Sequence, residues 1–95
     1  MKQVYAGETV ALDFTLPSST YSAEFQDAQG NLLTATVSQA AGTATVNVAA
    51  TQWPDGKPGI GHVQITDTTS GRSVVASERV RILKGLNISG GTGYA

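Results

Sequence analysis

The sequence predicts a small all-β protein: one sandwich of about seven antiparallel strands, followed by an extended C-terminal tail. The first observation is length, because 95 residues suffice for one domain with a modest core. The second is alternation, since apolar and polar residues take turns along most of the chain, as in strands with one face on a core. The third is a cluster of turn residues about every ten residues, a spacing typical of a sandwich.

The first four strands follow from alternation between turn signals. Val10, Leu12 and Phe14 alternate with polar neighbours, and Pro17 ends that strand. Gly30 marks a hairpin turn between the third and fourth strands, where glycine is expected to adopt a positive φ. These signals place the first four strands at residues 2–6, 9–16, 21–27 and 32–38.

The last three strands are separated by two further turns and one short helical segment. Gly42 marks the turn before the fifth strand, and residues 49–53 are expected to form a single helical turn. Val63 and Ile65 alternate in the sixth strand, and Gly71 marks the hairpin turn into the seventh. These strands are placed at residues 43–48, 60–67 and 72–83. Seven such strands favour an immunoglobulin-like sandwich.

The chain divides into a sandwich domain over residues 1–85 and a glycine-rich tail over residues 86–95. The tail is expected to be extended. It offers Leu86, Ile88 and Tyr94 as candidate partner-binding residues, anchoring it along a neighbouring subunit while its backbone forms hydrogen bonds.

Composition excludes several classes of function. The net charge is −1 and no basic patch is evident, so no nucleic-acid partner is expected. The absence of cysteine excludes disulfides and thiolate metal sites and suits a reducing cytoplasm. No apolar run has the length of a membrane-spanning helix, and residues 1–7 lack the apolar centre of a signal peptide, so no membrane partner is expected.

No set of residues in the sequence predicts catalysis, a metal or a cofactor. His62 is the single histidine, on the polar face of its strand, whereas catalytic zinc usually takes two or three imidazoles. The carboxylates are expected to be solvated, on polar faces or in turns; they are Glu8, Asp13, Glu24, Asp27, Asp55, Asp67 and Glu78. The protein is therefore predicted to be non-enzymatic.

Three residues are candidates for structural or binding roles. Trp53 precedes a proline and is predicted to anchor a loop over the end of the core. Arg79 and Arg81 lie two residues apart on the last strand, so they share one face. Paired arginines are usually solvated or matched to a neighbouring carboxylate, and they also suit the acidic groups of a partner protein.

Four segments together resemble a group of small immunoglobulin-like structural proteins of tailed bacteriophages. They are VYAGETV at residues 4–10, AATQWPDG at 49–56, GHVQITD at 61–67 and VASERVRI at 75–82. Their order is similar to the Y-x-G-D-T opening, the W-P-x-G corner, the V-T-D strand and the closing strand of that group. The resemblance covers about residues 4–83, and its sharpest part is the Trp-Pro-x-Gly corner.

This resemblance implies a virion structural protein made in the cytoplasm of the bacterial host. The expected role is capsid decoration or head–tail joining, and the expected partners are other virion proteins and further copies of the chain in a symmetric assembly. The resemblance brings no catalytic residue and no cofactor.

A carbohydrate-binding or adhesion module of the same fold is the alternative. Such a module needs exposed aromatic side chains on one face or in its loops. The candidates are Trp53, Tyr21 and Tyr94.

Overall fold

The computed structural model describes residues 2–54, 57–69, 71 and 73–84. These residues form seven strands and one short 3-10 turn, η1 (Ala50–Gln52). The strands are β1 (Lys2–Ala6), β2 (Val10–Thr15), β3 (Tyr21–Gln26), β4 (Leu32–Ala40), β5 (Thr43–Val48), β6 (Gly59–Asp67) and β7 (Ser73–Lys84). The predicted all-β class is therefore confirmed, and each strand lies within two residues of its predicted bounds.

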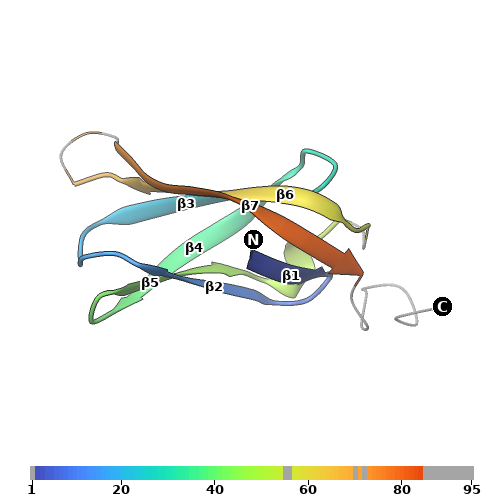
Figure 1. Cartoon of the computed structure of the whole chain (residues 1–95), viewed down its shortest axis with the longest axis horizontal. Helices are drawn as coiled ribbons and strands as arrows, with labels where there is room; N and C mark the ends of the chain where they lie inside the picture. The colour runs from blue at the N-terminus through green and yellow to red at the C-terminus, as the bar shows by residue number, and fades with distance from the viewer. Residues whose placement is uncertain (1, 55–56, 70, 72, 85–95) are drawn as a thin grey trace.

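The strands pair in the order β1-β7-β6-β3-β4-β5-β2, so each strand has at least one hydrogen-bonded neighbour (Figure 1). The two outermost strands, β1 and β2, follow one another along the chain, and the sheet is nearly closed into a barrel. All pairs are antiparallel except β1 with β7, where Lys2 lies beside Val80 and Ala6 beside Lys84. The prediction of a purely antiparallel fold is therefore wrong for β1, because periodicity within a strand does not encode the direction of its partner.

Strand β4 changes partner along its length. Its first part pairs with β3 from Gln26↔Leu32 to Glu24↔Thr34. From Ala35 onward it pairs with β5 instead. Next to the first part, the Gln52 side chain of η1 accepts a hydrogen bond from the Thr34 N–H at 3.2 Å. One strand thus joins β1-β7-β6-β3 to β5-β2.

The core lies between these two groups of strands and takes residues from all seven. Most positions that alternation assigned to the inside are buried, and the fully buried side chains include Phe25, Ile65 and Ile82. Leu16, Tyr21 and Ala23 are partly buried against this core. Trp53, just after η1, is 7% exposed and packs edge-on against Phe25 with the ring centroids 5.6 Å apart. Its Nε1 donates a hydrogen bond to the backbone oxygen of Glu8 at 2.9 Å.

The turns follow the predicted glycines. Gly30 has a φ of +89°, which L-residues rarely adopt, so it reverses the chain between β3 and β4 at little steric cost. The segment expected as a single helical turn is the 3-10 turn at Ala50–Gln52. None of the helical segments in the described part of the chain is long and apolar enough to span a membrane.

Candidate interaction surface

The strands β1, β7, β6 and β3, with the start of β4, present one face to the core and one to solvent. We call the solvent-exposed side the outer face. The register aligns its side chains in rows across the strands. One row holds Arg79, His62, Gln26 and Leu32; the next holds Gln3, Arg81 and Ile60; the last holds Tyr5 and Leu83.

Arg79 and Arg81 are both exposed on the outer face, as their spacing on β7 predicts. Their direct neighbours on β6 are His62 and Ile60, neither of which is acidic. Glu24 is two strands away on β3, and no carboxylate in the described residues forms an ion pair with either arginine. Both guanidinium groups therefore keep all their donors available to a partner.

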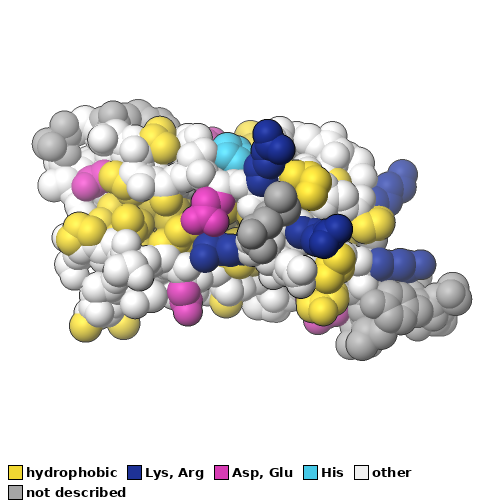
Figure 2. Space-filling model, in the orientation of Figure 1, with side chains coloured by type: hydrophobic (Ala, Val, Ile, Leu, Met, Phe, Trp, Pro, Cys, Tyr) yellow, Lys and Arg dark blue, Asp and Glu magenta, His cyan; other side chains and the backbone are white. Residues whose placement is uncertain are grey.

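Apolar side chains lie between and beside these arginines. Ile60 is 50% exposed and Tyr5 48% exposed, although both belong to regular strands. A shallow hollow of about 380 Å³ is lined by Ile60, Arg81 and Leu83 together with Pro58 and Gly59. Figure 2 shows Lys and Arg side chains beside hydrophobic ones over β6 and β7. A surface that mixes arginine with exposed aliphatic and aromatic groups has the composition of a protein interface.

His62 lies on the same face and contacts a hydroxyl group. Its Nε2 lies 2.8 Å from the Ser77 hydroxyl, across the β6–β7 pair. Among the described residues, no carboxylate forms a hydrogen bond with the His62 ring, so a nucleophile–base–acid relay is not present there. Within the described ranges, no group of three or more His, Asp or Glu side chains could hold a metal ion.

The prediction that all carboxylates are solvated is wrong for Asp27, which is 4% exposed. Its Oδ1 accepts hydrogen bonds from the backbone N–H groups of Gln29 and Asn31, at 3.0 and 2.8 Å. Its Oδ2 accepts one from the Asn31 side chain at 3.1 Å. The Asp27 carboxylate thus accepts three hydrogen bonds from groups of the β3–β4 turn, and these bonds compensate for its burial.

Asp67 also has a structural use. Its Oδ1 accepts the Thr69 N–H at 2.9 Å, and its Oδ2 accepts the Ser19 hydroxyl at 3.0 Å. The backbone N–H of Thr69, then the hydroxyls of Thr69 and Ser19, lower the pKa of this carboxyl below its ordinary value of 3.8. The group ties the turn after β6 to the loop before β3. Asp55 lies outside the described residues.

The other predicted site residues fall into two sets. Leu86, Ile88 and Tyr94 lie outside the described residues. Trp53 is buried beneath the turn at Glu8 and is not displayed on the surface. Sequence reasoning did not single out Tyr5 and Ile60, although alternation with the buried Val4 and Gly61 places both on the outer face.

Comparison with known proteins gives no relative. No protein-family model matches the chain, and neither a curated protein nor a solved structure matches it.

Proposed function

We propose that this chain is a non-enzymatic structural protein of a tailed-bacteriophage virion, a capsid decoration or head–tail joining component that binds other virion proteins. The observation that carries the proposal is the outer face, where two arginines without an ion pair among the described residues lie beside exposed apolar side chains. The resemblance of residues 4–83 to structural proteins of such phages adds the kind of assembly. In this proposal the protein is made in the host cytoplasm and ends in the virion.

The same proposal includes an immunoglobulin-like sandwich. In that fold the third, sixth and seventh strands form one sheet, and the second, fourth and fifth belong to the other. The order β7-β6-β3 and the order β4-β5-β2 agree with this division. The first strand departs from the constant-type arrangement, because β1 joins β7.

The outer face suits an acidic or polar partner. Each guanidinium can bind a carboxylate through two parallel hydrogen bonds, and it loses less hydration than an ammonium when it is covered. Ile60 and Tyr5 supply apolar area around that contact. Partner carboxylates therefore provide orientation, and the apolar groups provide most of the area removed from water.

The glycan-binding alternative has less support. Trp53, its strongest candidate anchor, is buried, and the Tyr21 hydroxyl donates a hydrogen bond to the backbone oxygen of Pro17. Tyr5 is exposed on the outer face, but its neighbours there among the described residues are polar or aliphatic.

The test is saturation binding of the purified chain to particles of the encoding phage from which this protein has been deleted. Replacing Arg79 and Arg81 together by Ala should weaken binding about tenfold or more, which corresponds to about 1.4 kcal/mol or more. The matched control is Ala11→Glu with Thr15→Glu, which changes the net charge by the same −2 on exposed positions of β2. The control should bind as the wild type does.

Two results contradict the proposal at different levels. Equal weakening of both double variants would mean that net charge alone matters and that the outer face is not the interface. Failure of the wild-type chain to bind particles that lack this protein would reject the virion role itself.

A further inference from the structure

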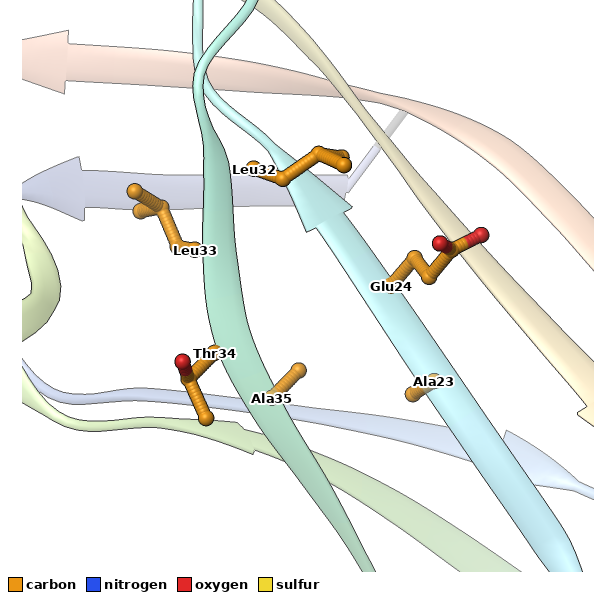
Figure 3. Close-up of a pocket in the computed structure, with 6 residues that line it drawn as sticks. All are labelled: Ala23, Glu24, Leu32, Leu33, Thr34 and Ala35. Atoms are coloured by element: carbon orange, nitrogen blue, oxygen red, sulfur yellow. The ribbon is translucent and has the colours of Figure 1, made fainter.

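The feature that carries a further inference is the place where β3 and β4 separate. Their pairing ends at Glu24↔Thr34, and the remaining residues of β4 pair with β5. The stretch Tyr21–Ala23 of β3 therefore pairs with β6 on one side, and no strand of the described residues pairs with it on the other. Figure 3 shows the two strands diverging at this point. We call this opening the β3–β4 fork.

The backbone of β3 directs hydrogen-bonding groups into the β3–β4 fork. In an antiparallel pair, successive residues point their N–H and C=O groups to opposite sides. The N–H of Asp27 bonds to Asn31 on the β4 side, whereas the C=O of Thr20 accepts from Thr68 on the β6 side. By this alternation Tyr21 and Ala23 point both backbone groups toward the fork, as an edge strand does toward a partner.

Apolar side chains lie at the floor of the fork. Ala23 and Ala35 point toward one another across it (Figure 3), and both are half-buried against the core. The hollow between the strands measures about 280 Å³ and is also lined by Leu32 and Leu33, with Glu24 and Thr34 as its polar members. Figure 2 shows hydrophobic side chains exposed in the region between β3 and β4. A strand laid here could bury alternate apolar side chains while its other side chains stay in water.

At the mouth of the fork, the Gln39 side chain forms with Ser19, just before β3, the two hydrogen bonds that a neighbouring strand would form. The Gln39 amide accepts a hydrogen bond from the Ser19 N–H at 3.1 Å, and its NH₂ group donates to the Ser19 carbonyl. Ser19 is two residues before Tyr21, so its N–H and C=O groups point to the same side as those of Tyr21 and Ala23. Gln39 therefore satisfies the next N–H and C=O groups along this edge. The open part of this edge is short, because it runs only from Thr20 to Ala23, between the Ser19 contact and the Glu24↔Thr34 pair.

We infer that the β3–β4 fork is a docking site for Leu86–Ser89 of a second copy of this chain, which adds to the free edge of β3. This segment has four residues and alternates apolar with polar: Leu86 and Ile88 against Asn87 and Ser89. In the proposed contact the two aliphatic side chains enter the hollow. The backbone then pairs with Tyr21 and Ala23. The inference rests on the proposed function in treating the chain as an assembly subunit.

The distance between Lys84 and the fork requires that the docked segment come from another copy of the chain. The deep end of the fork, at Glu24, aligns through Gln64 with Ser77, which is seven residues before Lys84, or about 23 Å along β7. Leu86 can lie at most about 7 Å from Lys84, and Ile88 at most about 14 Å. Neither side chain can enter the fork of its own chain, so the contact links one end of a copy to the fork of the next.

A contact between two different surfaces of identical chains repeats from copy to copy. The assembly closes into a ring when the rotation between successive copies allows it, and otherwise it grows into an open helical filament. The contact involves only the β3–β4 end of the outer face, where Leu32 lines the hollow. Arg79, Arg81 and Ile60 remain available to other virion proteins.

The absence of native cysteine permits a direct test with the full chain. One preparation carries Ala23→Cys and a second carries Ile88→Cys; the two are mixed and oxidised with diamide. The control mixture replaces Ala23→Cys by Thr15→Cys, an exposed position on β2. We expect a disulfide-linked heterodimer, identified by intact mass, in several-fold higher yield than in the control mixture.

A second measurement does not depend on a substitution in the fold. Sedimentation equilibrium of the wild type should show self-association that Leu86→Asn with Ile88→Asn weakens about tenfold or more. Equal cross-link yields in both mixtures, or a wild type that stays monomeric over the whole concentration range, would overturn the inference. If the chain carrying both cysteines closes a disulfide within itself, a second copy is not the donor.

The two experiments distinguish failure of the fork contact from failure of the proposed virion role. Cross-linking without any binding to the deleted particles would leave the fork contact standing and reject the virion role. Binding that depends on the arginines, without cross-linking, would do the reverse.

Discussion

Trp53 is a buried aromatic side chain that connects two loops of the fold. Its ring covers Phe25, and its Nε1 satisfies the Glu8 carbonyl, so it joins the η1 corner to the β1–β2 turn. Trp53→Ala should lower the free energy of unfolding by about 3–5 kcal/mol. Trp53→Phe keeps most of the packing but leaves the carbonyl unpaired, and should cost about 1–3 kcal/mol.

Urea unfolding followed by far-UV circular dichroism measures both changes, since the fluorophore is lost. Tyr5→Ala is the control, because that ring is 48% exposed and its removal should cost about 0.5 kcal/mol or less. If Trp53→Ala proved as mild as this control, the buried position of the ring would be wrong.

Gly61 is required for a steric reason. A Cβ built there would lie 2.3 Å from the backbone oxygen of Gln26, on the neighbouring strand. Gly61→Ala must therefore push β3 and β6 apart and should cost about 2 kcal/mol or more. Gly42→Ala provides the matched comparison, because its Cβ would meet no atom within 4 Å and only its φ of +81° is unfavourable. That change should cost about 1–2 kcal/mol, by the same urea measurement.

At the scale of elements, Asp67 joins the turn after β6 to the loop before β3. Its lowered pKa means that the folded state favours the carboxylate, so the stabilisation is present above about pH 4 and is lost as the pH falls through the folded pKa. Asp67→Asn should therefore destabilise the protein at pH 7. The difference from the wild type should shrink below pH 4. Thermal unfolding of both proteins between pH 7 and pH 2.5 gives this difference, and a constant difference would contradict the assignment.

The strands could be predicted from the sequence because their signal is local. Val10, Leu12 and Phe14 are buried in the order that alternation requires. The pattern fails on β7, where Val74 and Val75 are both exposed, because the register with β6 shifts by one residue there. The partner of each strand is not a local property, so neither the parallel pairing of β1 nor the departure of β4 from β3 could be derived.

The candidate surface was predictable in part for the same reason. The shared face of Arg79 and Arg81 follows from their spacing alone. That no carboxylate lies opposite them depends on which strand is adjacent, and this is fixed by the fold. Asp27 shows the opposite failure: turn residues are usually solvated, but the N–H groups of this turn converge on its carboxylate from inside.

At the scale of the whole molecule, β4 belongs to both groups of strands. Neither group keeps a complete set of neighbours if β4 is lost, so we expect the described fold to unfold in one cooperative step. Trp53 fluorescence reports on the η1 corner, and far-UV circular dichroism reports on all strands. Their urea midpoints should coincide. Two separate midpoints would show that β1-β7-β6-β3 survives without β5 and β2.

The parallel pairing of β1 with β7 also determines how the protein responds to a force that pulls its two ends apart. A pull applied between Lys2 and Lys84 draws the two strands past each other along their own direction. Its five register pairs then carry the load together and do not open one by one from an end. A subunit joined to its neighbours through these two ends would transmit tension along the direction in which the five pairs share the load.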